Sequence, residues 1–149
     1  MKCVVQKVKE SHVDIDGNRV GSINEGLMVL VGFNYNDNQE IVDKMINKLI
    51  HLRIFLDEND KMNLSLLDVG GSILSISQFT LYANCKKGRR PSFVEAAKPE
   101  ISSPLYDYFN QQLINSNINV QMGVFGADMK VSLINDGPIT ILLDSDELF

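Results

Sequence analysis

The stretch Ile73-Leu74-Ser75-Ile76-Ser77-Gln78-Phe79-Thr80-Leu81 begins as an apolar strand and then turns polar. Its first four residues have the composition of a buried strand. Ser77, Gln78 and Thr80 then place hydrogen-bonding side chains where the same pattern favours further core residues. The change indicates that the end of this strand has a role besides packing.

A second interruption, Asn135-Asp136-Gly137-Pro138-Ile139-Thr140, enters the last apolar run of the chain. Proline cannot donate a backbone hydrogen bond and is rare inside strands. An X-Pro bond becomes cis at a cost of about 0.5–1 kcal/mol, and glycine adopts backbone angles closed to other residues. The Gly137-Pro138 step therefore predicts a backbone shape that matters in itself, with two carbonyl oxygens side by side. A simple turn into the last strand is the alternative when the step is considered alone.

Together these segments resemble the two signatures of the D-aminoacyl-tRNA deacylase family, which read close to SQFTL and NxGP(V/I)T. Either signature alone is a weak match, whereas both in one chain of family-like length form a specific one. The resemblance covers nearly the whole chain, because further segments fit the usual order of the family: Arg53-Ile54-Phe55, Lys61-Met62-Asn63, Arg90-Pro91-Ser92-Phe93, Leu105-Tyr106-Asp107-Tyr108-Phe109 and Ala127-Asp128-Met129.

The resemblance implies a homodimeric hydrolase that cleaves the ester between a D-amino acid and tRNA and spares the L-aminoacyl ester. Glycine on a non-cognate tRNA is expected to be cleaved as well. The family pocket is largely backbone, and the neighbouring 2′-hydroxyl of the RNA is thought to assist the attack. On that basis the amides of Phe79 and Thr80 hold the ester oxygen, Gln78 positions the terminal adenosine and Ser77 shapes the strand.

The resemblance also assigns a chirality filter to Gly137 and Pro138. In the family this dipeptide is cis and enters the pocket of the partner subunit, where its carbonyls bind the substrate amino group and exclude an L side chain. Lys7 stands where the family often has arginine, so a contact that braces the Gly-Pro loop is expected to lose its bidentate geometry. Met129 matches a family position and is expected to line the pocket.

Several of these residues also have a purely structural interpretation. Thr80 has no visible base to take its proton, so positioning is favoured over covalent catalysis, and a threonine that satisfies local backbone groups is the alternative. Phe79 in a strand is usually a core residue, although its backbone can still be functional. Met129 can be simple packing.

The net charge of −5 argues against a protein coated in positive potential, so any RNA contact must be local. The best candidate is the segment Lys86-Lys87-Gly88-Arg89-Arg90, which carries four cations directly after the presumed strand of Gln78 and Thr80. A solvated loop is the alternative reading, since charge runs commonly face water. The position beside the proposed pocket favours tRNA phosphate contact.

Composition fits one compact unit. The 149 residues, with 44% hydrophobic content, predict a single domain spanning residues 1–149. Neither a membrane-length apolar run nor a signal peptide is apparent, so a cytoplasmic protein without a membrane partner is expected. Cys3 and Cys85 are expected to be free thiols.

The pattern of elements predicts an α+β fold of layered ββα type, with mixed or antiparallel sheets and helices packed on one side. The hairpin turn is expected at Asp16-Gly17-Asn18, a helix from a capping box at Asp37 and Glu40 to about His51, and a short helical turn at Ser92–Glu95. A second main helix is expected to begin at Ser103-Pro104. The expected strands are 3–8, 12–15, 19–23, 27–33, 73–81, 118–124, 129–133 and 139–143.

The common catalytic constellations are missing from the sequence. There is no G-x-S-x-G elbow, no zinc motif and no nucleotide-binding glycine pattern, so neither a metal nor a cofactor is expected. His12 and His51 have little specific context and are expected to be structural or exposed. Alternative functions are an editing deacylase for L-amino acids, a non-catalytic tRNA-binding or dimeric interaction protein and, most weakly, a serine-type esterase.

Overall fold

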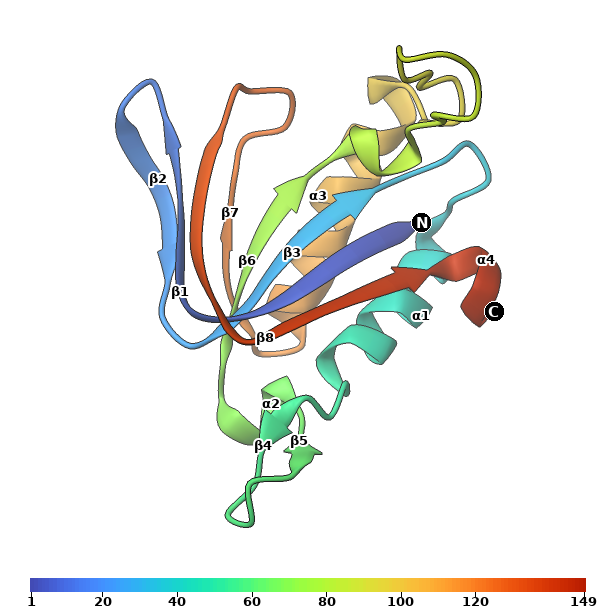
Figure 1. Ribbon diagram of the computed structural model, residues 1–149. Helices are drawn as coiled ribbons and strands as arrows, with labels where there is room; N and C mark the ends of the chain where they lie inside the picture. Colours follow the sequence, from blue (N-terminus) through green and yellow to red (C-terminus); the bar gives the residue numbers. More distant parts are fainter.

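A computed structural model describes residues 1–149 as a curled sheet of six strands with the two main helices on one face (Figure 1). The strands of this sheet are β1 (Lys2–Ile15), β2 (Asn18–Ile23), β3 (Gly26–Gly32), β6 (Ser72–Ser77), β7 (Asn119–Met122) and β8 (Lys130–Asp144). The remaining elements are α1 (Gln39–Ile50), β4 (Phe55–Leu56), β5 (Met62–Leu64), α2 (Leu66–Val69), the 3-10 helix η1 (Phe79–Tyr82), α3 (Pro99–Asn115) and α4 (Ser145–Leu148). The expected α+β class, with a mixed sheet and helices on one side, is confirmed.

Strand β1 organises the sheet because it pairs with three others. Its first half is antiparallel to β3, its second half is antiparallel to β2, and β8 runs antiparallel along its other edge. Strands β3, β6 and β7 then continue the sheet in parallel. The change of partner along β1 bends the sheet until β2 approaches β7, where a Cβ built on Gly21 lies 3.3 Å from the Met122 carbonyl oxygen.

Two separate apolar cores result from this curl. The larger contains 24 buried residues and lies between the sheet and helices α1 and α3. The smaller lies inside the curl and contains six buried residues, among them Val8, Met28 and Ile76. Strand β6 has Ile73 in the first core and Leu74 in the second, which explains why its apolar residues are consecutive.

The expected strands 3–8 and 12–15 are one strand. Register shifts near Val8 and Ser11 let β1 bend without ending, as bulges do. The expected hairpin is confirmed, and its turn residues Asp16 and Gly17 both have positive φ, 50° and 77°. Positive φ angles at both positions are typical of the tight hairpin turns whose twist matches that of the two paired strands. The expected strands 129–133 and 139–143 are likewise one strand, β8.

Helix α1 begins one residue later than the expected capping box. Its N-cap is Asn38, whose side chain accepts a hydrogen bond from the Ile41 amide at 3.1 Å. Asp37 is not available for capping because its carboxylate accepts hydrogen bonds from the Met1 amino group and, at 2.7 Å, from the Asn34 amide. A long-range ion pair has therefore displaced the local motif.

Helix α3 begins at Pro99, not at Ser103-Pro104. No helix forms at Ser92–Glu95, where the chain makes a single turn in which the Ala96 amide donates to the Phe93 carbonyl oxygen at 3.1 Å. Pro99 occupies the first helical position, where the missing N–H has no partner to lose. Pro104 lies inside the helix and is exposed, as is Glu100, so water can reach the carbonyl that Pro104 cannot satisfy. Ser92 instead forms an isolated antiparallel bridge with Asn84.

Strand β7 is shorter than expected and ends at Met122. The chain then leaves the sheet, and residues 123–129 form the connection to β8. No helix of the protein is long and apolar enough to cross a membrane.

Candidate functional site

A cavity of about 520 Å³ opens at the end of β3 and β6, between η1, the start of α3 and the β7–β8 connection. Eleven of its 17 lining residues are hydrophobic. The lining consists of Val31, Gly32, Phe33, Ile76, Ser77, Gln78, Phe79, Phe93, Ala96, Ala97, Pro99, Ser102, Phe125, Gly126, Ala127, Met129 and Val131. None of these residues has a side chain that titrates as an acid or a base.

The polar segment after β6 forms the wall of the cavity on the side of β3. Ser77 ends the strand, and the Gln78 amide donates to the Val31 carbonyl at 2.7 Å. The chain then forms the 3-10 helix η1. Phe79 and Thr80 therefore lie in that helix and not in the strand that was expected for them. A Cβ built on Gly32 would lie 2.8 Å from the Gln78 carbonyl oxygen, so glycine is what lets the turn lie this close to β3.

Phe79 does not belong to the core. The residue is 56% exposed, and its ring meets the Phe93 ring edge-to-face, with ring centroids 5.1 Å apart. The core interpretation of Phe79 was therefore wrong, because it assumed a strand that had already ended. Phe93 was not among the predicted site residues, although its place in the segment Arg90-Pro91-Ser92-Phe93 was a usable signal.

Thr80 does not line the cavity. Its hydroxyl oxygen accepts a hydrogen bond from the Gln78 side-chain amide, and both residues are half-buried. Thr80 thus holds the side chain of a residue that does line the cavity.

Met129 lines the cavity, as expected, together with the segment that precedes it. A Cβ built on Gly123 would lie 2.4 Å from the Met129 sulfur, so Gly123 leaves the space that this side chain fills. Phe125, Gly126 and Ala127 complete this wall. Ala127 belongs to the segment Ala127-Asp128-Met129 that fits the family, whereas Phe125 and Gly126 were not predicted, because a loop between two strands gives no periodic signal.

The Gly137–Pro138 peptide bond is cis, in agreement with the expectation from the resemblance. Both residues are exposed, and neither lines the cavity. Asn135 closes the turn from both sides: its side-chain oxygen accepts from the Ile139 amide at 2.8 Å, and its side-chain nitrogen donates to the Thr140 hydroxyl at 2.9 Å. The turn is therefore a protruding segment of β8 held by its own side chains.

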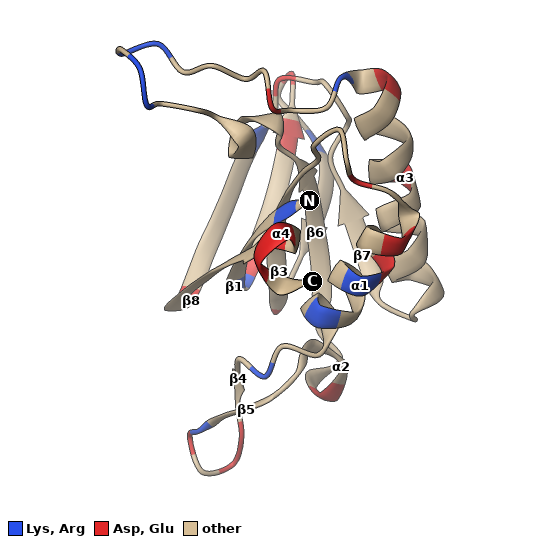
Figure 2. Cartoon of the chain, turned by 90° about the vertical axis from the view of Figure 1, so that its right-hand side faces the viewer, with Lys and Arg blue, Asp and Glu red and all other residues tan.

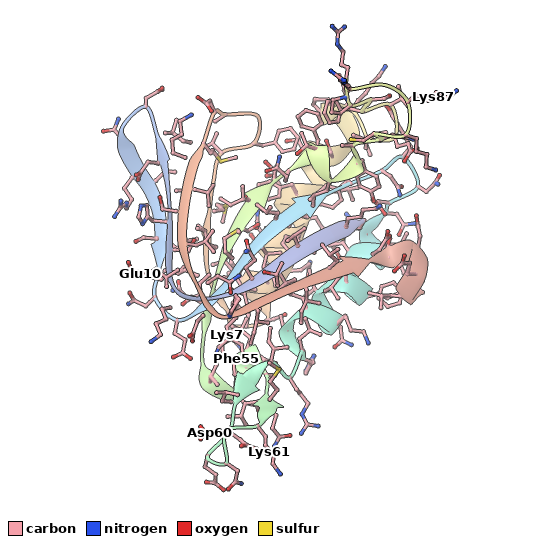
Figure 3. The ribbon with its side chains drawn as sticks, in the orientation of Figure 1. Lys7, Glu10, Phe55, Asp60, Lys61 and Lys87 are labelled. Atoms are coloured by element: carbon pink, nitrogen blue, oxygen red, sulfur yellow. The ribbon has the colours of Figure 1, made fainter.

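Lys7 contacts this turn and not the cavity. Its ammonium group lies 3.1 Å from an Asp136 carboxylate oxygen and 5.5 Å from the centre of the Phe55 ring. Only 8% of the Lys7 side chain is exposed, compared with 32% for Asp136. Figure 3 shows Lys7 and Phe55 far from Lys87, which lies on the basic loop.

Lys86, Lys87, Arg89 and Arg90 are all exposed on the loop between η1 and α3. Figure 2 shows this loop projecting from the body of the molecule with cationic residues near its tip. The bridge between Asn84 and Ser92 forms its stem, and Phe93 just beyond the stem lines the cavity. The structure therefore places the four cations on a loop that leads to the rim of the site.

The remaining reactive side chains lie elsewhere. His12 faces Asp14 at 3.8 Å and His51 lies against the Asn47 carbonyl oxygen at 2.8 Å. Cys3 and Cys85 are free thiols, as expected, and burial raises the pKa of Cys3 to about 12. No group of three or more His, Cys, Asp or Glu is placed to hold a metal ion.

Comparisons with known proteins agree with this architecture. The chain is 52% identical to a D-aminoacyl-tRNA deacylase of Thermosipho africanus (strain TCF52B), over 149 residues and 100% of both chains. It is 53% identical to a D-aminoacyl-tRNA deacylase of Clostridioides difficile (strain 630), again over 149 residues and 100% of both chains.

Two solved structures share the fold. One, a c-Myc DNA unwinding element binding protein, has a TM-score of 0.91 and 37% identity, over 97% of this chain and 98% of its own. The other, a probable eukaryotic D-amino acid tRNA deacylase, has a TM-score of 0.82 over 95% of this chain and 97% of its own. At 18% identity this second likeness shows the fold alone. A model of the D-Tyr-tRNA(Tyr) deacylase family matches residues 4–144, and the chain belongs to that family.

Proposed function

We propose that this protein hydrolyses the ester bond between a D-amino acid and the 3′ end of tRNA, and that it spares L-aminoacyl-tRNA. Family membership supports the reaction class, and the full-length relatives at 52% and 53% identity bear the name of this activity. Glycine on a non-cognate tRNA is part of the proposal, because a filter that acts on side chains cannot reject a residue that has none. We also propose that residues 1–149 form a single domain and that the protein is cytoplasmic.

The observation that carries the proposal is a pocket without a titratable side chain. An aminoacyl ester is already activated, so its hydrolysis requires mainly orientation, stabilisation of the oxyanion and a positioned water. A cavity whose polar side chains are Ser77, Gln78 and Ser102, among mostly apolar residues, suits such a reaction. A mechanism that depends on a histidine or carboxylate base would need a residue that this lining does not contain.

At the edge of the pocket we assign the oxyanion site to the amides of Phe79, which lines the cavity, and of Thr80, the next residue. These are the first residues of η1, and the first N–H groups of a helix have no carbonyl partner inside it. To Gln78, whose side chain donates a hydrogen bond to the Thr80 hydroxyl, we assign the contact with the terminal adenosine. Ser77 sets the end of β6 from which the turn departs.

The chirality filter of this proposal is the Gly137-Pro138 turn of a second copy of the chain. The turn is exposed and lies outside the pocket of its own chain, so a role in that reaction requires a partner subunit. Exposed apolar side chains on the same strand, including Ile134 and Leu142, support an assembly through this region. A fixed backbone excludes an L side chain because it cannot retreat, and each ~1.4 kcal/mol of clash gives a tenfold preference.

The basic loop is the proposed contact for the tRNA backbone. Lys86, Lys87, Arg89 and Arg90 are exposed and bear no ion pair within the chain, so they are free to meet phosphates. Replacing these four residues with uncharged ones should weaken tRNA binding and reduce its salt dependence. Turnover of a short aminoacyl-nucleoside ester should change much less.

The decisive experiment compares D-tyrosyl-tRNA, L-tyrosyl-tRNA and glycyl-tRNA as substrates for the metal-free protein. Rapid release of D-tyrosine and glycine with the L ester intact supports the proposal. Survival of the D ester contradicts it. Cleavage of a mismatched L-aminoacyl-tRNA instead would identify an editing deacylase of the opposite specificity. A stable monomer that retained full chiral selectivity would exclude the cross-subunit filter.

A second candidate, nucleic-acid binding without ester cleavage, is favoured by one observation. The 37% identical structural relative is named for binding a DNA element and covers 97% of this chain. Such a protein would bind RNA or DNA through the basic loop in a salt-sensitive way and would release no amino acid. Measuring binding and turnover on the same sample distinguishes the two candidates.

A further inference from the structure

Behind the pocket, a buried tyrosine joins helix α3 to the sheet through one carbonyl oxygen. The Tyr106 hydroxyl donates to the Ser75 carbonyl oxygen at 2.8 Å, and the two residues are 2% and 0% exposed. Burial raises the pKa of Tyr106, so this hydroxyl stays protonated and remains a donor. Tyr106 lines no part of the cavity and has no role in the proposed reaction so far.

The same Ser75 oxygen also holds the start of the pocket wall. The Gly123 amide donates to it at 3.0 Å, at the point where β7 has ended and the connection to β8 begins. From Gly123 the chain continues directly to Phe125, Gly126, Ala127 and Met129, which all line the cavity. One carbonyl oxygen therefore ties both Tyr106 and the wall segment 123–129 to β6.

A second contact links Tyr106 to that wall. Its ring packs against the ring of Phe125, with centroids 6.1 Å apart and planes inclined by 45°. Phe125 is only half-buried, and its other side faces the cavity. Tyr106 thus contacts the wall through its ring and anchors it through its hydroxyl.

Other buried polar atoms lie close to this anchor. The side-chain nitrogen and oxygen of Asn110, one turn further along α3, are buried without a hydrogen-bond partner, as is the Ser75 hydroxyl. Buried polar atoms without partners are costly, so their presence beside Tyr106 points to a functional constraint on this part of the core. Removing the Tyr106 hydroxyl would leave the Ser75 oxygen with Gly123 alone.

We propose that Tyr106 is a positioning residue of the pocket, which holds the wall segment 123–129 in place through the Ser75 carbonyl oxygen and the Phe125 ring. This inference rests on the proposed function, because it assumes that the cavity holds the aminoacyl ester. Its predicted consequence is that the placement of Met129 and Phe125 against the substrate depends on a hydroxyl that the substrate never touches.

The test compares Tyr106→Phe with Tyr108→Phe. Both residues lie on α3, and both substitutions remove one hydroxyl, but the Tyr108 hydroxyl binds Asp43 at 3.0 Å on the exposed side of the molecule. Two properties are measured in each variant: amide hydrogen exchange across residues 119–129, and kcat and KM for D-tyrosyl-tRNA well below the unfolding temperature.

In Tyr106→Phe we expect exchange of residues 123–129 to accelerate about threefold to tenfold, the factor that corresponds to one lost hydrogen bond. The kcat/KM for D-tyrosyl-tRNA is expected to fall by a similar factor. Tyr108→Phe should show neither change. Unaltered exchange in the wall, or faster exchange with unaltered kinetics, would reduce Tyr106 to an ordinary core residue and overturn the proposal.

Gly123→Ala tests the same wall without touching Tyr106. The added methyl group meets the flexible end of Met129, at 2.4 Å from its sulfur, and should push that side chain into the cavity. A rise in KM for D-tyrosyl-tRNA supports the inference, and wild-type kinetics contradict it. A wild-type protein that fails to cleave D-tyrosyl-tRNA would overturn the proposed function instead, whereas the exchange measurements would still report on the Tyr106 anchor.

Discussion

The two polar interruptions, Ser77–Phe79 and Asn135–Thr140, have opposite fates in the folded protein. The first lines a cavity together with Phe93 and the start of α3. The second stays within β8, with Gly137 and Pro138 exposed and the turn held by Asn135 and Lys7. A polar break in a strand thus becomes concave or protruding according to what the rest of the chain packs over it.

This difference fits a site assembled from two copies of the chain. Under the proposed function, the concave segment contributes the pocket of one copy, and the protruding segment contributes the Gly137-Pro138 backbone of the other. Each is incomplete for the proposed reaction by itself. The predictions below change one segment at a time and ask whether the two functions separate.

The largest effect is expected from Gly32→Ala at the concave segment. The new Cβ would lie 2.8 Å from the Gln78 carbonyl oxygen, a backbone atom that can move only with the whole turn. We expect the free energy of unfolding to fall by about 1–3 kcal/mol. Turnover of D-tyrosyl-tRNA should drop about a hundredfold, because a displacement of about 1 Å of the groups that bind the substrate typically has an effect of this size. Urea unfolding and single-turnover kinetics measure the two effects.

Gly21→Ala in β2 is the control, because its new Cβ meets its nearest neighbour, the Met122 oxygen, at 3.3 Å. It should affect turnover little. Equal losses of turnover in both variants would mean that general destabilisation, and not the Gln78 turn, controls the reaction.

At the protruding segment, Gly137→Ala should mainly reduce selectivity. Gly137 has a φ of 140°, and an added Cβ would lie 3.0 Å from the Ile139 backbone nitrogen, so the turn must change shape. We expect the ratio of D to L cleavage to fall about tenfold, equivalent to ~1.4 kcal/mol of lost discrimination. The ratio of kcat/KM values for D- and L-tyrosyl-tRNA gives the result.

Gly17→Ala provides the matched control, because Gly17 also has a positive φ, of 77°, but an added Cβ there contacts nothing within 4 Å. It should weaken the β1–β2 hairpin and leave the D to L ratio intact. A ratio unaffected by Gly137→Ala would separate the Gly-Pro turn from chirality.

A smaller effect is expected from Asp136→Asn, which leaves the buried Lys7 charge without its ion-pair partner. Because Asp136 is about a third exposed, water can replace part of the interaction, and we expect a loss of about 1–2 kcal/mol in the free energy of unfolding. Asp128→Asn breaks the exposed Lys130 pair, with side chains 74% and 86% exposed, and should cost almost nothing. Equal unfolding midpoints in urea would show that Lys7 does not brace the turn.

The smallest effect concerns the two thiols and provides a probe of the basic loop. Cys85 is exposed beside Lys86, whereas Cys3 is buried in β1 and its pKa is raised to about 12, so it stays protonated at neutral pH. One thiol per chain should react rapidly with Ellman's reagent, and peptide mapping should locate it at Cys85. Bound tRNA should slow that reaction if the loop contacts RNA. Rapid modification of Cys3 in the folded protein would contradict the burial of β1.

Local patterns determined much of this protein by themselves. The apolar runs gave β3 and the first part of β6, the Asp16-Gly17 pair gave the hairpin turn, and the spacing of apolar residues gave α1. The two polar segments stood out as candidate site segments because their departure from strand composition is visible without any structure, and the first of them lines the cavity. These signals are local, since hydrophobic periodicity and turn chemistry depend on neighbours in the sequence.

Tertiary structure decided the rest. The ion pair of Asp37 with the Met1 amino group prevents Asp37 from capping α1 as expected. Bulges let two expected short strands form the single strand β1. Strand β6 ends before Phe79, where Gln78 lies close to Gly32. Phe93 and Phe125 reach the pocket from two separate loops, and Tyr106 of α3 packs behind Phe125. Contacts between residues distant in the chain leave no periodic pattern in the sequence. The sequence therefore indicated candidate segments of the site, and only the folded structure shows which of them line the cavity.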